Sequence, residues 1–469
     1  MIAALVLAVT QIVLSPCVIE GVPGPTHCGN YRVWEDRTLK RGRQITISIT
    51  VLNALASPHK PDALFTLQGG PGDAPSFNAR FYGRVFAEIR KTRDIVLVDL
   101  RGTGKSGALL CPELGLPDSS GILDADILSV AALRNCRTRL EKQTDLTQYT
   151  TEIAVDDLDE VRRALGYEQI NLYGTSYGSR VAQVYMQRHP SALRTVTLKG
   201  VVPPSMASPE NHARASEEAW QDLVKRCQAD TQCAQNFPNL DADFRSLLDN
   251  LQKTPPVIAV PASDGRGETK LNLTRGLFAE AFRNFLYSPE ASARAPALLK
   301  TLATGDQKLL GETSLNARLL LGGERLAAGF FLSVSCTEDV PFLPKNLAAL
   351  TANTFAGDYR LRQQIDACRV WPSGKVSTKH GQLTRSTVPT LLISGEFDPV
   401  TPPSGGEEVL RGLSKGLHVV VKNNGHPIGT AAKCIESMMA SFIEKGSTAA
   451  LDTSCAATVS AVPFATSFR

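Results

Sequence analysis

The residues that could do chemistry begin with Ser176, in the pentapeptide Gly-Thr-Ser-Tyr-Gly that runs from Gly174 to Gly178. A serine hydroxyl is a poor nucleophile until a base takes its proton. The pentapeptide alone also arises by chance and could be an ordinary turn between a strand and a helix. The apolar run 170–173 comes directly before it and a helix-like segment directly after it. This setting is typical of a nucleophile elbow, so Ser176 is the predicted nucleophile.

His426 and Asp398 are the predicted base and the acid that orients it. His426 follows the β-branched run 418–421, and Asp398 follows the run 390–394. Both therefore lie at the carboxyl ends of predicted strands, where active sites of α/β proteins form. Glu396 is a competing acid. The chain order serine, aspartate, histidine is that of α/β hydrolases and not of the chymotrypsin or subtilisin folds.

Backbone N–H groups are predicted to stabilise the oxyanion that forms when the serine attacks a carbonyl. One donor should come from Tyr177, the residue after the nucleophile. The other should come from Gly70, in the glycine-rich segment 68–72 that follows the apolar run 63–67. A plain surface turn is the alternative for this segment, but its place at the end of a predicted strand favours the catalytic interpretation.

Short apolar runs rich in β-branched residues predict the strands that position these groups. Most runs are continuous, which is typical of strands covered by helices on both faces. An apolar stripe at Ala154, Leu158, Val161 and Leu165 predicts a helix between two of the strands, and a second helix follows Gly178. Alternating strands and helices predict a mostly parallel sheet. The predicted strands are 45–52, 63–67, 94–100, 170–173, 195–201, 390–394 and 418–421.

The middle of the chain differs from its two ends. Residues 205–384 lack strong strand signals and contain helix-like pieces such as 215–227, 244–251 and 275–285. We therefore expect an α/β-hydrolase fold with a mostly parallel central sheet and an inserted, mainly helical cap domain. The core would comprise residues 17–204 and 385–469, with the cap between them.

Ten cysteines fall along the chain as five local couples, which indicates disulfides and an oxidising compartment. Ten buried thiols are the alternative. The apolar stretch Ile2–Leu14 has the length of a signal-peptide core, so residues 1–16 are predicted to be signal-peptide-like and the protein to be exported, to the periplasm or beyond. A first strand or a buried helix is the alternative for this stretch. The couples are Cys17 and Cys28, Cys111 and Cys136, Cys227 and Cys233, Cys336 and Cys368, and Cys434 and Cys455.

Composition excludes several classes of protein. The formal net charge is +4 and the lysines and arginines are scattered, which argues against nucleic-acid binding. No segment is long and apolar enough to predict a membrane span in the mature protein. Cysteine and histidine spacings do not match zinc motifs. The predicted serine mechanism requires no metal and no organic cofactor, so we expect neither. The oligomeric state stays open.

Five segments together resemble the prolyl aminopeptidase family of α/β hydrolases, and more closely its secreted tripeptidyl aminopeptidase branch. The similarity covers nearly the whole chain from Cys17 onward, and the branch also carries similar cysteine segments. One departure is Gln68, where prolyl aminopeptidases usually have histidine. The resemblance implies cleavage of short peptides from a free N-terminus, with a cap that restricts access. The segments are 69–72, 99–106, 174–179, 395–402 and 425–426.

An exopeptidase of this kind must bind the ammonium group of its substrate, and buried acidic side chains would do so. Glu338 and Asp339 are the candidates, with an exposed acidic pair as the alternative. Trp371 could line an apolar subsite or belong to the core. The leading hypothesis is an exported serine aminopeptidase that acts on short peptides. The alternatives are a carboxylesterase or another amide or lactone hydrolase, and a binding protein without catalysis.

Overall fold

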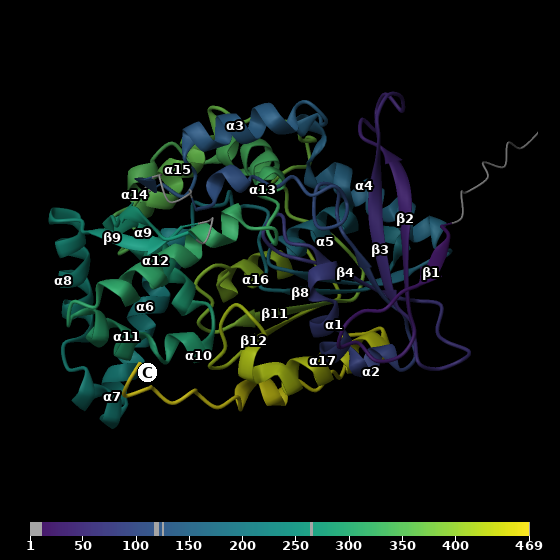
Figure 1. The fold of residues 1–469 in the computed structure, drawn as a ribbon. Helices are drawn as coiled ribbons and strands as arrows, with labels where there is room; N and C mark the ends of the chain where they lie inside the picture. Colours follow the sequence, from purple (N-terminus) through teal and green to yellow (C-terminus); the bar gives the residue numbers. More distant parts are fainter. Residues whose placement is uncertain (1–11, 117–121, 124–125, 263–265, 469) are drawn as a thin grey trace, which may run out of the picture.

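The computed structural model describes residues 12–116, 122–123, 126–262 and 266–468 (Figure 1). Within this part of the chain, a nine-stranded sheet has the order β1-β2-β3-β5-β4-β7-β8-β11-β12. Pairing is antiparallel from β1 to β5 and parallel from β5 to β12. Its strands are β1 (Leu14–Pro16), β2 (Thr26–Trp34), β3 (Gln44–Leu52), β4 (Leu64–Leu67), β5 (Ile95–Val98), β7 (Ile170–Thr175), β8 (Leu193–Lys199), β11 (Thr390–Gly395) and β12 (Gly416–Val421).

The parallel strands are apolar on both faces because each face has its own core. Leu64 and Ile95 pack in one buried cluster with helices α1 (Ala79–Val85), α2 (Ala87–Arg90) and α17 (Ala432–Lys445). Their neighbours along the strands belong to a second buried cluster, which contains the helices α4 (Thr151–Ala164) and α5 (Tyr177–Arg188). Successive side chains of a strand point to opposite faces, so burial on both sides produces the continuous apolar runs of the sequence.

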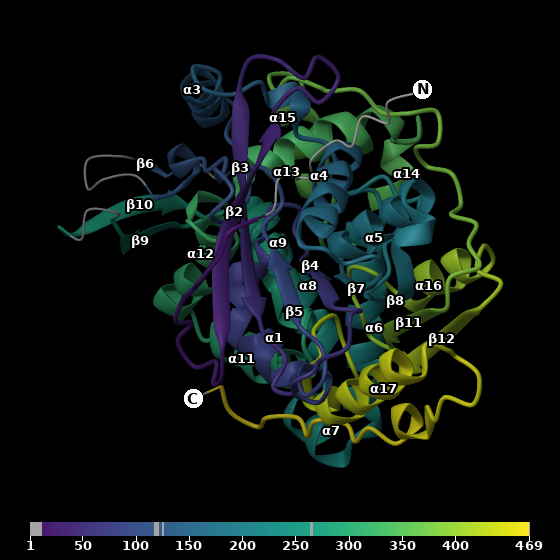
Figure 2. The same cartoon turned by 90° about the vertical axis from the view of Figure 1, so that its right-hand side faces the viewer.

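All seven predicted strands are present, as β3, β4, β5, β7, β8, β11 and β12. Strand β2 was not predicted, because most of its residues are only partly buried and its sequence carries no apolar run. Figure 2 shows β2 and β3 in front, near the antiparallel edge of the sheet. The amphipathic helix is confirmed as α4, with the Thr150 side chain accepting a hydrogen bond from the Ile153 N–H at its start.

The chain between β8 and β11 is mainly helical and lies beside the sheet, at the left of Figure 1. It also contains two strands that the sequence did not predict, β9 (Val257–Pro261) and β10 (Glu268–Asn272), which alternate between buried and exposed residues. Its helices are α6 (His212–Ala229), α7 (Thr231–Asn236), α8 (Leu240–Lys253), α9 (Arg275–Arg283), α10 (Pro289–Ser292), α11 (Ala295–Leu302), α12 (Gln307–Gly322), α13 (Ala328–Val334), α14 (Leu347–Thr351) and α15 (Tyr359–Cys368). We call this segment the cap.

Three smaller elements complete the fold. Strand β6 (Ile122–Leu123) pairs with β10, so a piece of chain that precedes α4 joins the small sheet of the cap. Helix α3 (Val130–Leu140) contacts the cap helix α15. Helix α16 (Pro403–Leu410) packs on β11 and β12. The core and the cap are therefore in contact along several segments that are distant in sequence.

The C-terminal segment ties the last core helix back to the cap. After α17 the chain runs to the cap near α11, as the yellow trace in Figure 1 shows. The Ala465 N–H donates to the Ala293 carbonyl at 3.0 Å, and the ring of Phe468 packs on Phe285 and under Arg294. This segment therefore connects the cap to the core independently of the two crossings at β8 and β11.

All ten cysteines are paired in disulfides, and the pairs are the five local couples of the sequence. Residues 1–11 lie outside the described residues, and with them most of the predicted leader. Leu14–Pro16 pairs with β2 as strand β1, directly before the disulfide of Cys17. Among the described residues, no helix has the length and apolar character needed to cross a membrane.

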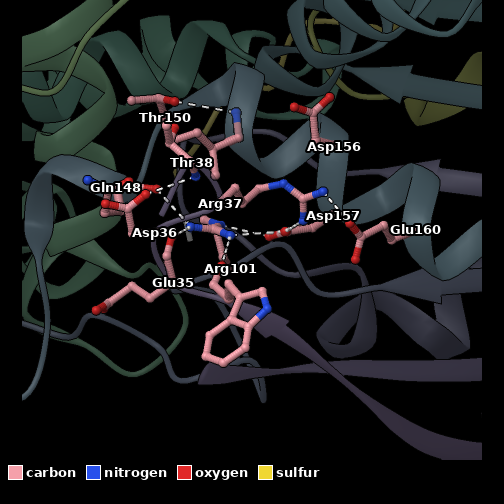
Figure 3. A network of polar contacts seen from close by, with 12 residues as sticks. Glu35, Asp36, Arg37, Thr38, Arg101, Gln148, Thr150, Asp156, Asp157 and Glu160 are labelled. Carbon is pink, nitrogen blue, oxygen red and sulfur yellow. Dashed lines mark hydrogen bonds and ion pairs between the residues drawn. The ribbon is translucent and has the colours of Figure 1, made fainter. Parts of the chain in front are cut away.

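The segment 99–106, one of those that carry the family resemblance, is structural. The Arg101 guanidinium is fully buried and donates to both carboxylate oxygens of Asp157, at 2.7 and 2.9 Å (Figure 3). It also donates to the backbone carbonyls of Trp34, Glu35 and Gln148. Arg101 thus joins the end of β2, the turn before α4 and α4 itself, which positions the layer of helices that supports α5.

Replacing Arg101 with methionine should destabilise the protein by about 3–5 kcal/mol, because it leaves the buried Asp157 carboxylate with Arg37 as its remaining cation and leaves three backbone carbonyls without the Arg101 donors. Urea denaturation followed by far-UV circular dichroism would measure the loss. Arg43→Ala is the matched control: Arg43 pairs with Glu35 from a side chain that is 44% exposed, so its loss should cost less than about 1 kcal/mol. Equal effects for the two variants would contradict this account of Arg101.

Candidate active site

Ser176 stands on a strained turn between β7 and α5, with φ 55° and ψ −125°. The turn is possible because glycines flank it. A Cβ at Gly174 would overlap the carbonyl oxygen of Gly178, and a Cβ at Gly178 would overlap the carbonyl oxygen of Leu67 on β4. The backbones of β4, β7 and α5 therefore approach too closely for any other residue at these positions. This is the geometry of a nucleophile elbow.

His426 and Asp398 are hydrogen-bonded, with 2.8 Å between the imidazole Nδ1 and the carboxylate Oδ2. Asp398 also accepts from the backbone N–H groups of Val400 and Thr401, both at 2.9 Å, and from the Thr401 hydroxyl at 2.8 Å. Burial alone would raise the pKa of Asp398, but the charges of His426 and Lys199 and these hydrogen bonds hold it below its ordinary value. The carboxylate is therefore ionised and fixed against the imidazole.

Lys199, which the sequence analysis missed, ties the end of β8 to both Ser176 and His426. Its backbone carbonyl accepts from the Ser176 N–H at 2.9 Å, and its ammonium group donates to the His426 carbonyl. The side chain is 1% exposed. Burial lowers its pKa to about 8, against the opposing charge of Asp398. The sequence offered one signal for Lys199: it is a charged residue near the end of an otherwise largely apolar predicted strand.

Tyr287, from the cap, also holds His426. Its backbone carbonyl accepts from the His426 N–H at 2.7 Å, and the two rings meet edge to face with 5.3 Å between their centroids. The histidine loop is therefore fixed from the core side by Lys199 and from the cap side by Tyr287. No local sequence pattern marks Tyr287, because its role depends on how the cap packs on the core.

The predicted oxyanion donors lie around Ser176. Tyr177 begins α5, so its N–H belongs to the first turn, where backbone donors have no acceptor within the helix. Gly69 lies against the nucleophile, since a Cβ built on it would stand 3.0 Å from the Ser176 Cβ. Gly70 comes one residue later, at φ 112°, beside Gly72 and Leu326 of the cap. The sequence analysis did not single out Gly69.

Gln68 fixes the loop that carries these glycines. Its amide donates to the Asp73 carboxylate at 3.1 Å, and its carbonyl accepts from the buried Tyr82 hydroxyl at 2.7 Å. The departure from the family pattern at this position therefore leaves the loop anchored at both ends by side-chain hydrogen bonds.

A cavity of about 500 Å³ lies between the core and the cap at this site. Ser176, Tyr177 and His426 line it from the core. Tyr287 and Phe331 line it from the cap. Within the described residues, Ser176 Oγ makes no recorded side-chain hydrogen bond, and catalytic hydrogen bonds often tighten only around a substrate. The arrangement brings a hydroxyl, an oriented imidazole and backbone donors to one cavity, which suits acyl transfer.

The three predicted substrate-binding residues occupy different places. Asp339 lines the Ser176 cavity and pairs with Arg180 at 2.7 Å. Glu338 and Trp371 do not line that cavity. The buried Glu338 carboxylate accepts from the N–H and hydroxyl of Thr151, both at 2.6 Å, and burial raises its pKa to about 7. Glu338 lines a separate cavity of about 190 Å³, and Trp371 belongs to the hydrophobic core.

Metal-type donors come together at one place among the described residues, where Cys111, Glu113 and Cys136 bring their donor atoms within 4.8 Å. The two sulfurs are joined in a disulfide. Cysteine binds metals as the thiolate, so this group is not a metal centre.

The fold and the site define an α/β hydrolase, and comparison with known proteins agrees. Residues 62–429 match the family described as alpha/beta hydrolase fold, and the chain belongs to that family. Serine protease Hip1 of Mycobacterium tuberculosis is 24% identical over 465 residues, which cover 91% of this chain and 86% of the relative. The tripeptidyl aminopeptidase of Streptomyces coelicolor is 23% identical over 468 residues, which cover 93% and 84%.

A proline iminopeptidase from Mycobacterium smegmatis is among the similar solved structures, with a TM-score of 0.39, 15% identity and coverage of 89% of this chain and 98% of that one. The predicted fold class and the predicted family resemblance are confirmed by the family match and by the named relatives. The predicted enzyme class, a serine hydrolase of the α/β-hydrolase type, is confirmed with them.

The burial of Lys199 predicts a pH-dependent stability. With a folded pKa of about 8 and an ordinary value near 10.5, the unfolded chain binds more protons between these values, so stability should rise with pH across this range. The cost of burying the charge is fully present at pH 7 and falls by about 2 kcal/mol by pH 9.5.

Lys199→Met removes this cost at every pH. Relative to the unaltered protein, its free energy of unfolding should therefore drop by about 2 kcal/mol between pH 7 and pH 9.5, measured by urea denaturation at both values. Lys308→Met is the control, because the Lys308 side chain is 86% exposed and its loss should leave the difference unchanged with pH. A Lys199 variant with no pH-dependent difference would refute a depressed pKa.

Proposed function

We propose that the protein is an exported serine aminopeptidase that releases amino acids or short peptides from peptide N-termini. The observation that carries the proposal is the cavity that Ser176 and the oriented His426 both line. The names of the relatives, serine protease and tripeptidyl aminopeptidase, favour a peptide bond as the target. The five disulfides favour an oxidising compartment.

In the proposed mechanism, Ser176 Oγ attacks the scissile carbonyl carbon while His426 Nε2 takes the hydroxyl proton. The negative charge on the carbonyl oxygen is stabilised by backbone N–H groups, with Tyr177 and Gly70 as the proposed donors and the adjacent Gly69 as a further candidate. His426 then donates the proton to the departing amine as the C–N bond breaks. Water, deprotonated by His426, hydrolyses the acyl-enzyme and restores Ser176.

Asp398 orients His426 and stabilises its charged form during both steps. Three hydrogen bonds, from Val400 and Thr401, hold the carboxylate so that it does not reorganise when the imidazole becomes charged. Thr401 also lies 3.1 Å from His426 Nδ1 and reinforces the same orientation.

The cap favours exopeptidase action, because the cavity of about 500 Å³ accommodates a chain end rather than a long folded substrate. Of the two acidic residues proposed for the ammonium group, Asp339 is the one that lines this cavity. The Arg180 guanidinium donates a hydrogen bond to Asp339 Oδ1 at 2.7 Å. A substrate ammonium group would therefore have to share the carboxylate with this guanidinium. We therefore keep Asp339 as the candidate and omit Glu338.

The first prediction from this mechanism concerns the triad. Ser176→Ala should abolish labelling by a fluorophosphonate probe and lower kcat by about a millionfold, and Asp398→Asn should lower it by about ten-thousandfold while the fold persists. In-gel fluorescence and arylamide hydrolysis measure the two effects. Ser179→Ala is a control and should still be labelled, because the Ser179 hydroxyl donates a hydrogen bond to the Ser176 backbone carbonyl and is not the predicted nucleophile. Labelling that persists in Ser176→Ala would disprove the nucleophile assignment.

The second prediction separates peptidase from esterase. Aminoacyl and tripeptidyl arylamides with a free N-terminus should be cleaved, and N-acetylated versions of the same arylamides should be cleaved at least tenfold more slowly. Turnover of simple aryl esters alone would instead favour a carboxylesterase, which would use the same triad. A protein that is neither labelled nor active on any of these substrates would be a binding protein.

A further inference from the structure

The cavity at Ser176 carries more positive than negative charge. Its lining includes five cationic and three acidic side chains. Two of the cations have a carboxylate of their own: Arg180 pairs with Asp339 at 2.7 Å, and Arg325 lies 3.6 Å from Asp73. Lys199 is buried beside His426 and Asp398. The surplus is therefore two positive units: one is Lys199, whose charge is opposed by Asp398, and the other lies among the remaining charged lining residues, Glu280, Arg283 and Arg360.

These three residues form a cluster in which one carboxylate serves two guanidinium groups. Glu280 Oε1 accepts from Arg283 at 2.7 Å and from Arg360 at 3.3 Å. Glu280 and Arg283 come from α9, and Arg360 comes from α15. Glu280 and Arg283 are 5% and 4% exposed, so solvent does little to screen the cluster. Its net charge is one positive unit, enclosed in the wall of the cavity.

Arg360 is held in place with one edge open to the cavity. Its Nε donates to Gln364 at 2.9 Å, and its guanidinium lies over the Phe331 ring at 5.4 Å from the centroid. Among the described residues, its Nη2 has no recorded hydrogen-bond partner, and the side chain is 17% exposed. A guanidinium fixed by neighbours and left with free donors is suited to bind a carboxylate.

The cluster lies close to the catalytic groups. Arg283 Nη1 donates to the Tyr287 hydroxyl at 2.7 Å, and the Tyr287 ring packs edge to face on the ring of His426. One tyrosine side chain thus separates the guanidinium of Arg283 from the imidazole. A short substrate whose carbonyl is at Ser176 would reach the cluster within the same cavity.

His212, a further lining residue, adds no charge to the cluster. Burial, and then the charges of Arg283 and Arg360, hold the pKa of His212 well below its ordinary value. The histidine is therefore neutral at physiological pH. Its buried Nδ1 has no partner among the described residues, so it makes no hydrogen bond to either arginine.

We propose that Arg360, supported by Arg283 and Glu280, binds a carboxylate of the substrate. The inference rests on the proposed function and narrows its substrate class to short peptides that carry a negative charge near the scissile bond. Two sources supply that carboxylate: an aspartate or glutamate side chain, or the free C-terminus of a very short peptide. The cluster binds the same chemical group in both cases.

Matched pairs of peptides test the proposal and distinguish the two sources. Each fluorogenic peptide with glutamate is paired with one that has glutamine at the same position, and each short peptide with a free C-terminus is paired with its C-terminal amide. We expect at least one member of this set to show a tenfold or greater preference in kcat/KM for the charged partner. The pair that shows the preference identifies the source.

Arg360→Gln should reduce that preference to less than twofold by slowing only the charged substrate, mainly through a higher KM. Arg362→Gln is the matched control on the same helix, because Arg362 is 46% exposed and pairs with Asp126 outside the cavity. Glu280→Gln should act in the opposite direction and increase the preference, since the cluster then carries two positive charges. A merely structural cluster would slow charged and neutral substrates alike in both variants.

Protection of Ser176 from the fluorophosphonate probe tests the site without any peptide turnover. Glutarate should slow the labelling of the unaltered protein, glutaramide should not, and Arg360→Gln should remove the effect of glutarate. Normal labelling of Arg360→Gln without glutarate would show that its active site is folded; if it is not labelled, Arg360→Lys replaces it, and it should weaken the protection.

The results separate failure of this inference from failure of the proposed function. Protection by glutarate without cleavage of any peptide would support the carboxylate site and refute the peptidase. Cleavage of peptides with no charge preference in any pair, and no protection by glutarate, would refute the carboxylate site and leave the peptidase standing.

Discussion

The close approach of three backbones at the elbow is the constraint on which the site depends. Glycines at 174 and 178 allow β7 and the start of α5 to lie against the end of β4, and Ser176 takes a left-handed conformation as a result. A non-glycine residue at φ 55° is costly and persists only where its surroundings fix it. Here the sheet fixes the surroundings of Ser176, which explains why strand residues buried on both faces and a partly exposed serine occur in one short segment.

The histidine depends on a second constraint, because its loop is held by both the core and the cap. Lys199 donates to its carbonyl from β8, and Tyr287 accepts from its N–H. Removing the cap would therefore change the position of His426, the proposed base, as well as the access route. The C-terminal segment that returns to Ala293 also supports this arrangement, because it holds the cap against the core.

The strands that the sequence predicted correctly are those whose apolar residues follow one another without interruption. Continuous β-branched runs identified the parallel strands because both of their faces are buried. Asp398 and His426 were proposed because they follow such strands, and the structure places them 2.8 Å apart. Strand β2 was missed because its partly exposed residues form no apolar run, and β10 because Leu271 is its one apolar residue. Strand β9 does contain the apolar run 257–260, but burial alternates along it and the sequence analysis did not single it out.

The parts of the site that sequence reasoning missed depend on tertiary packing. Tyr287 and Arg360 reach the cavity from separate segments of the cap and belong to no local motif. Glu338 and Asp339 are neighbours in sequence, yet a π-helical turn at Ser335–Asp339 sends them to different cavities. Adjacent position in the chain therefore could not decide which acid lines the cavity at Ser176.

The charge of the cavity also bears on catalysis. In the proposed mechanism the imidazole of His426 becomes positively charged, and every uncompensated cation nearby opposes that step. Asp398 compensates the imidazole directly, but the surplus charge of the arginine cluster reaches it across Tyr287. A bound substrate carboxylate would cancel that surplus and favour the charged imidazole. Binding energy at the cluster would then contribute to the rate of the chemical step as well as to affinity, because the interaction strengthens as charge develops on His426.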